Sequence, residues 1–301
     1  MTRITLKAHA KINFNLKITG RRPDGYHLIE SVVQAIDLHD TLTLEPSAAE
    51  GILLEVDDPR LPGGPENLVW KAAHAIQSRS AGPHCGVLIR LEKRIPSGAG
   101  LGGGSSDAAA ALVGLRRLWN LDLSDQDLAS LAASIGSDVP FFLTGGTALI
   151  TGTGTEVRPL PDRSGFEILI VFPGVPISTR EVYGRVVVPL TSALKISSMP
   201  RFRPTPRDNL TKEVETWVRA GNDLEPYACA LCPAIGMIKD RLQAAGASAA
   251  AMTGSGSAVF GVFRSPAATE RALADLGPAG FAALRCAPIS RLEYRRRAGL
   301  D

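Results

Sequence analysis

The chain has 301 residues, 45% of them hydrophobic and 21% charged, which is ordinary for a globular protein with one large or two modest domains. Its formal net charge of +3 is too small to indicate a nucleic-acid or membrane partner. Four cysteines make no disulfide scaffold at this length, no apolar run approaches the ~20 residues that span a bilayer, and the N-terminus lacks the apolar stretch of a signal peptide, so we expect a cytoplasmic protein.

The first predicted element is a long strand. Apolar and polar residues alternate strictly over positions 4–18, which indicates a half-buried antiparallel strand with one polar face. Such a strand would extend about 50 Å, longer than usual, so we expect a break or bulge near residues 8–10. Lys11, Asn13 and Asn15 lie on the polar face.

Shorter elements follow. The turn Arg22-Pro23-Asp24-Gly25 is expected to lead into strands over 28–38, 41–45 and 52–56, a helix over 67–78 and a strand over 87–91.

A glycine-rich segment comes next. Residues 96–106 read Pro-Ser-Gly-Ala-Gly-Leu-Gly-Gly-Gly-Ser-Ser and lead into an alanine-rich helix predicted to begin near Ser105 and to run to Trp119. Glycine leaves a bare backbone whose N–H groups can surround an anion, and the start of a helix adds unpaired N–H donors and the positive end of the helix dipole. The segment therefore predicts a phosphate site.

Two common phosphate motifs fit this segment poorly. The Walker A pattern requires a lysine that is absent here, which excludes it. Gly98, Gly100 and Gly103 do satisfy the dinucleotide pattern G-x-G-x-x-G, and Asp122 lies where a ribose-binding acid would be expected. Against that interpretation, residues 93–97 separate the loop from its strand, and the preceding chain shows no βαβ alternation.

The middle of the chain carries a candidate carboxylate. Ser124 and Asp127 form a capping-box pattern that predicts a helix ending at Gly136. Asp138 precedes Pro140, so it should lie in extended or turn backbone. Residues 145–154 are predicted to form one strand with glycine-rich ends.

The second half has a different element order. We expect a strand over 167–172, helices within 179–242 interrupted by a proline-rich stretch at 199–206, strands over 248–252 and 258–263, a helix over 267–276 and a strand over 283–289. This is the βαββαβ order of a ferredoxin-like fold. We expect the boundary near residue 160. The run Arg295-Arg296-Arg297 is interpreted as a solvated tail.

Three segments in order resemble the motifs of the GHMP small-molecule kinases, the family of galactokinase and of homoserine, mevalonate and phosphomevalonate kinases. They are Ala10-Lys11-Ile12-Asn13, residues 96–107, and Met252-Thr253-Gly254-Ser255-Gly256-Ser257. The resemblance implies an α+β, two-lobed GHMP kinase fold. Its ATP-binding lobe, ribosomal-protein-S5-like, would span 1–160, and its ferredoxin-like (βαββαβ) lobe would span 161–301.

Further segments are similar to one branch of that family, which acts in the non-mevalonate route to isoprenoid precursors. They are Arg22-Pro23-Asp24-Gly25-Tyr26-His27, Ser137-Asp138-Val139-Pro140-Phe141-Phe142 and Asn222-Asp223-Leu224-Glu225-Pro226. The likeness implies transfer of the γ-phosphoryl group of ATP to the 2-hydroxyl of a cytidine-diphosphate-linked methylerythritol. Ser137 departs from the alanine frequent there, and the stretch 199–207 has no counterpart.

The resemblance also implies roles for individual residues. Asp138 would be the catalytic base and Lys11 the neighbouring cation that stabilises developing negative charge. Asn13, Tyr26 and His27 would bind the acceptor, with Thr179 and Tyr183 forming the opposite wall. ATP, with Mg²⁺, would bind at Pro96, Ser97, Gly98, Ala99, Gly100, Leu101, Gly102, Gly103, Gly104, Ser105 and Ser106, and at Asn67, for which helix capping is an equally good interpretation.

Other interpretations stay open on the sequence alone. The acceptor could be another alcohol, such as homoserine, mevalonate or a sugar. A ligand sensor on the same fold would be expected to have lost the lysine, the aspartate or the glycine loop, and all are present here. A dehydrogenase is the remaining alternative. Small molecules are the expected partners, and the chain is expected to be a monomer or weak homodimer with no metal ligand identifiable among its carboxylates.

Overall fold

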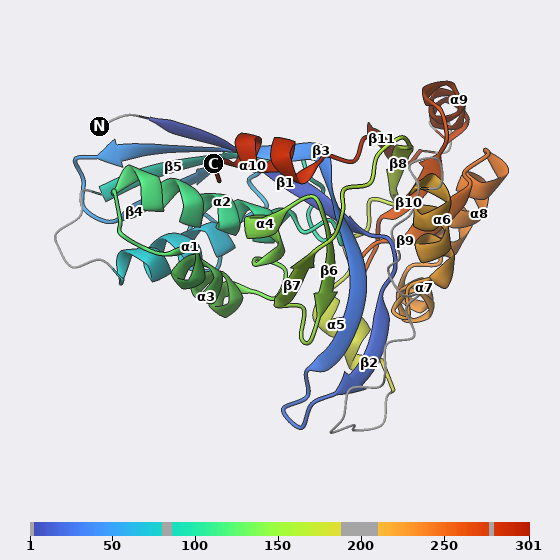
Figure 1. Cartoon of the computed structure of the whole chain (residues 1–301), viewed down its shortest axis with the longest axis horizontal. Coiled ribbons are helices and arrows are strands. Elements are labelled where there is room, and N and C mark those ends of the chain that lie inside the picture. Colours follow the sequence, from blue (N-terminus) through green and yellow to red (C-terminus); the bar gives the residue numbers. More distant parts are fainter. Residues whose placement is uncertain (1–2, 80–85, 188–209, 277–279) are drawn as a thin grey trace.

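The computed structural model describes residues 3–79, 86–187, 210–276 and 280–301, which form two sheets with helices packed on them (Figure 1). The larger, seven-stranded sheet has the order β4-β5-β3-β6-β7, with β1 and β2 both paired to β3. Its strands are β1 (Ile4–Asn13), β2 (Lys17–Arg21), β3 (His27–Ser47), β4 (Ile52–Val56), β5 (Gly86–Glu92), β6 (Thr147–Thr151) and β7 (Glu156–Pro159). Most of its pairings are antiparallel, unlike the parallel sheet of a dinucleotide-binding fold.

The long strand β3 organises this sheet. It pairs with β1, β2, β5 and β6 along its length, so the two predicted strands over 28–38 and 41–45 are one strand. The bulge expected near residues 8–10 is confirmed, because the β1–β3 register shifts between His9 and Lys11. The strand predicted over 4–18 ends earlier, at Asn13, and the strand predicted over 145–154 is followed by a second one, β7.

The second half of the polar face of β1 is buried, contrary to expectation, whereas Thr5 and Lys7 in its first half are exposed. His9, Lys11, Asn13 and Asn15 are all at most 5% exposed. The alternation alone predicts a half-buried strand because sequence periodicity cannot show what covers the polar face. The turn at Thr253 and the C-terminal helix cover it here: Asn13 N donates to Thr253 Oγ1 over 3.0 Å, and the centroids of the His9 and Tyr294 rings are 5.7 Å apart.

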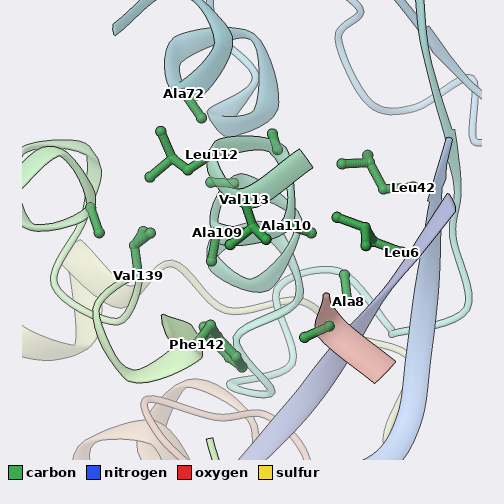
Figure 2. Packing of buried hydrophobic residues seen from close by; sticks show 14 of the residues in the cluster. Leu6, Ala8, Leu42, Ala72, Ala109, Ala110, Leu112, Val113, Val139 and Phe142 are labelled. Carbon is green, nitrogen blue, oxygen red and sulfur yellow. The ribbon is translucent and has the colours of Figure 1, made fainter. Parts of the chain in front are cut away.

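Helix α2 lies at the centre of the larger core. Figure 2 shows its residues Ala109, Ala110, Leu112 and Val113 surrounded by side chains of β1, β3 and α1. Helix α2 spans Gly103–Leu118, and its neighbouring helices are α1 (Leu68–Gln77), α3 (Asp125–Ile135) and the short α4 (Phe141–Thr144). The predicted capping box at Ser124 is present, and Asn67 is the N-cap of α1. Close packing over the length of α2 holds its first turn, next to the glycine segment, in a defined position.

The second sheet confirms the ferredoxin-like order. Its strands are β8 (Glu167–Phe172), β9 (Ala249–Met252), β10 (Val259–Phe263) and β11 (Ala282–Cys286), in the antiparallel order β11-β8-β10-β9. Its helices are α5 (Thr179–Gly184), α6 (Leu210–Ala220), α7 (Glu225–Leu231), α8 (Ala234–Ala244) and α9 (Pro266–Leu276). The proline-rich stretch at 199–207 lies outside the described residues. The division near residue 160 stays a prediction.

A C-terminal helix, α10 (Arg291–Ala298), replaces the expected solvated tail. Ser290 caps it, and its buried Tyr294 donates a hydrogen bond to the Phe142 carbonyl over 2.6 Å. Its charged sequence has no apolar stripe, since only Tyr294 and Ala298 are buried, which explains why periodicity missed it. Within the described residues no helix is long and apolar enough to cross a membrane.

The buried His9 predicts a specific pH dependence of stability. Burial, together with His39, Arg297 and Lys7, lowers the pKa of His9 to about 3. The unfolded chain therefore takes up a proton below pH 6.5 that the folded chain takes up only near pH 3, so stability falls as the pH falls through this window. In the wild type, this loss in the free energy of unfolding should approach about 1.4 kcal/mol per pH unit, and His9→Gln should remove it. Urea unfolding of both proteins at several pH values measures the difference. Parallel curves for the variant and the wild type would contradict this.

Candidate active site

The structure brings Lys11 and Asp138 together. Lys11 lies on β1 just after the bulge and is 4% exposed, and its Nζ is 3.4 Å from Asp138 Oδ2. Asp138 lies in the turn between α3 and α4, where the buried Val139 and Phe142 hold the backbone against the core around α2 (Figure 2). Its own side chain is 40% exposed. The pair is thus open to a substrate on the side of the carboxylate only.

A buried hydrogen-bond network orients Lys11. Its Nζ donates to Asn13 Oδ1 over 2.6 Å, and Asn13 Nδ2 donates to Ser31 Oγ over 2.7 Å. Ser31 in turn donates to the Asn15 carbonyl. The ammonium group therefore lies between a neutral amide and a carboxylate, with its orientation fixed before any ligand binds.

The glycine segment is held by its carbonyl groups. Four successive carbonyls accept hydrogen bonds from other parts of the chain: Gly98 from Ile177 N (3.3 Å), Ala99 from Ala258 N (3.1 Å), Gly100 from Thr253 Oγ1 (3.4 Å) and Leu101 from Lys11 N (2.9 Å). The N–H of a trans peptide points opposite to its carbonyl. Each N–H group that follows one of these carbonyls therefore points away from the partner of that carbonyl, which leaves it available to a bound phosphate.

The segment ends at the first turn of α2, which begins at Gly103 rather than near Ser105. Gly102 has a φ of 73°, and a Cβ there would lie 2.8 Å from the Phe142 ring and 3.0 Å from Lys11 Cγ. Glycine thus lets the Lys11 stem pass directly beside the loop. Asn67 uses both ends of its amide, accepting from Val69 N and donating to the Pro62 carbonyl, so the structure supports the capping interpretation.

The expected acceptor residues gather around a hairpin and α5. Tyr26 is 62% exposed at the tip between β2 and β3, and the His27 ring lies 5.3 Å from the Tyr183 ring. Burial, and then the charge of Asp138, raises the pKa of Tyr183. Burial, then Arg21, lowers the pKa of His27, which favours the neutral ring. Thr179 Oγ1 is 2.7 Å from Ser255 Oγ, which joins α5 to the late glycine turn.

A buried ion cluster beneath α2 was not predicted. Lys93 contacts both Asp40 and Asp107, and Asp40 also accepts hydrogen bonds from the backbone of Arg94 and Ile95. Burial raises the pKa of Asp107 to about 8 despite its lysine partner. The cluster ties the first half of α2 to β3 and to the end of β5. Its members are far apart in the sequence, and no local pattern indicates the contact.

Comparison with known proteins agrees with this geometry. The family model for the GHMP kinases N terminal domain matches residues 67–146, and the model for the GHMP kinases C terminal domain matches residues 207–283. The chain therefore belongs to the GHMP kinases.

Its curated relatives indicate the branch. A protein of Pelotomaculum thermopropionicum named 4-diphosphocytidyl-2-C-methyl-D-erythritol kinase is 44% identical over 86% of this chain and 88% of its own length. A protein of the same name from Pelobacter propionicus is 40% identical over 94% of this chain and 99% of its own length. A solved structure of 4-(cytidine 5'-diphospho)-2C-methyl-D-erythritol kinase matches with a TM-score of 0.73 and 34% identity, covering 94% of this chain and 98% of that one. A homoserine kinase from Cytophaga hutchinsonii shares the fold. Its structure matches with a TM-score of 0.68 and 18% identity, covering 96% of this chain and 95% of that one.

Proposed function

We propose that this protein transfers the γ-phosphoryl group of ATP to the 2-hydroxyl of 4-diphosphocytidyl-2-C-methyl-D-erythritol. The observation that carries the proposal is the Lys11–Asp138 pair, 3.4 Å apart, beside a glycine loop whose carbonyls face the protein. The shared name of the relatives supports the choice of acceptor. The reaction is a step toward isoprenoid precursors.

The geometry supports a direct transfer. Asp138, exposed on one side, accepts the proton of the acceptor hydroxyl as its oxygen attacks the γ-phosphorus and the bond to the β-phosphate oxygen breaks. Lys11, already oriented by Asn13, stabilises the charge on the transferring group and on the forming alkoxide. Because the lysine is fixed beforehand, little reorganisation is needed when this charge develops.

The nucleotide phosphates are placed on the N–H groups of residues 98–106, with the positive end of the α2 dipole beneath them. Mg²⁺ would neutralise phosphate charge there. Among the described residues no group of three or more His, Cys, Asp or Glu side chains could hold a metal ion. Ser106 Oγ is buried and has no hydrogen-bond partner, so it fits as a ligand for an ion bound mainly by the phosphates.

The acceptor's cytosine is placed on the Tyr26 ring, with the neutral His27 imidazole donating to and accepting from its polar edge. Tyr26→Ala should raise the acceptor KM about tenfold or more, since base–aromatic stacking is worth about 1–3 kcal/mol, and should leave the ATP KM in place. Tyr26→Phe keeps the ring and should lose much less. An acceptor KM that does not respond to Tyr26→Ala would place the cytosine elsewhere.

A coupled assay of ADP release tests the whole proposal. The cytidine compound should be turned over with a far higher kcat/KM than homoserine, mevalonate or galactose. A preference for one of those alcohols would keep the kinase chemistry and overturn the acceptor. We also propose that the protein works in the cytoplasm on small molecules alone, as a monomer or weak homodimer.

A further inference from the structure

Residues 222 and 223, between α6 and α7, contact both halves of the site although the reaction proposed above assigns them no role. Leu16 lies between β1 and β2, and its N–H donates to the Gly221 carbonyl over 3.2 Å. The Asp223 N–H donates to the Leu16 carbonyl over 2.9 Å, which makes a parallel bridge between Leu16 and Asn222. The bridge attaches this loop of the second half to the point where the acceptor hairpin begins.

The side chain of Asn222 holds the late glycine turn. It is 6% exposed, and its Nδ2 donates to the Met252 carbonyl over 3.0 Å and to the Gly254 carbonyl over 2.7 Å. Its Oδ1 accepts from Leu224 N, so both ends of the amide are bound. A Cβ on Gly254 would lie 3.2 Å from Lys11 Nζ. Asn222 therefore fixes the piece of backbone that lies against the catalytic lysine.

The side chain of Asp223 holds the hairpin. Its Oδ2 accepts from Ile18 N over 2.9 Å, and its Oδ1 accepts from Lys17 Nζ over 2.8 Å. Both donors are in the first two residues of β2, which among the described strands pairs with β3 alone. That pairing ends at Arg21 and His27, next to the exposed Tyr26. Asp223 thus anchors the base of the hairpin whose far end carries the proposed cytosine contacts.

We propose that Asn222 and Asp223 are positioning residues that set the two substrates against each other. Asn222 places the turn beside Lys11 and the phosphate loop, and Asp223 places the hairpin that presents the acceptor. The two side chains are adjacent in sequence, so a single short segment fixes the distance between the acceptor and the phosphoryl group. A displacement of about 1 Å of the turn beside Lys11 can cost about a hundredfold in rate. A looser hairpin weakens binding of the acceptor, and the acceptor that does bind still meets the same catalytic groups. This inference rests on the proposed function.

The two positions should give different kinetic signatures. Asp223→Ala removes a charge-assisted tether and should raise the acceptor KM about tenfold, with kcat and the ATP KM within about twofold. Asn222→Ala should lower kcat about tenfold or more with a smaller effect on the acceptor KM, because it releases the turn beside Lys11. Asn222→Asp is nearly isosteric and keeps the hydrogen bond from Leu224 N, but it loses the two hydrogen bonds that the amide donates to the turn. It replaces the alanine variant in this test if that variant folds poorly.

A control variant and a second measurement distinguish a positioning role of Asn222 and Asp223 from general destabilisation of the fold. Glu270 lies on α9, and Glu270→Ala removes its surface ion pair with Arg285 of β11, which should change none of the kinetic constants. Amide hydrogen exchange over residues 17–27 should accelerate in Asp223→Ala and not in Asn222→Ala, whatever acceptor the enzyme uses. If the wild-type enzyme does not turn over the cytidine compound, the proposed function fails. Amide hydrogen exchange still tests whether Asp223 anchors the hairpin. Unchanged hairpin exchange in Asp223→Ala, or equal shifts of kcat and KM in both variants, would overturn the inference.

Discussion

Asp138→Asn should lower kcat by about 10²–10⁴ while ATP binding stays near the wild-type value. The amide has the size of the carboxylate but cannot take the hydroxyl proton. Asp138 lies beside the phosphate loop without contributing to it, and Lys11 keeps its bond to Asn13, so the nucleotide site should remain assembled. The measurement is steady-state turnover together with an equilibrium ATP affinity.

The matched control for Asp138→Asn is Asp125→Asn. Asp125 is a carboxylate paired with Arg116 at 2.9 Å on the first turn of α3, outside the proposed site. Surface ion pairs contribute about 0–1 kcal/mol, so the control should cost little stability and no turnover. If Asp138→Asn behaves like the control, Asp138 is not the base. The lysine and the phosphate loop would then carry the rate enhancement by position and charge alone.

Local signals in the sequence predicted most of the helices and strands, but not the candidate catalytic pair. The capping box at Ser124 and the helix capped by Asn67 depend on neighbouring residues, the bulge near residues 8–10 was expected from the length of the alternating pattern, and the structure contains all three. The positions of Lys11 and Asp138 followed from the family resemblance of their motifs. The alternation in β1 placed Lys11 and Asn13 on one face, but it could not indicate that this face would be buried.

Features that depend on distant contacts were missed. Residues 39 and 40 were expected to separate two strands, one over 28–38 and one over 41–45. Asp37 instead accepts a hydrogen bond from Ala287 N, and Asp40 accepts two from the backbone after β5, so β3 continues through them. Asn222 belonged to a recognised motif, yet only its contacts with the turn at 252–254 suggest what it does. Tertiary hydrogen bonds of this kind leave no periodic signal in a sequence.

Gly100→Ala should lower kcat/KM for ATP by about a hundredfold or more. Gly100 has a φ of 77°, where a residue with a side chain costs about 1–2 kcal/mol. A Cβ would also lie 2.3 Å from the Thr253 carbonyl oxygen and 3.1 Å from Gly256 N. The phosphate loop and the late glycine turn must therefore separate, and the loop would lose the position that directs its N–H groups toward the nucleotide.

Gly246→Ala separates the two costs of that substitution. Gly246 has a φ of 93°, but a Cβ added there would have no heavy atom within 4 Å, so alanine meets the backbone strain without the collision. Both variants should lose a similar amount of stability from strain, about 1–2 kcal/mol in chemical unfolding. Only Gly100→Ala should lose ATP affinity, as measured by titration of the purified protein. If the two variants bind ATP equally well, close contact between the two glycine segments is not what shapes the phosphate site.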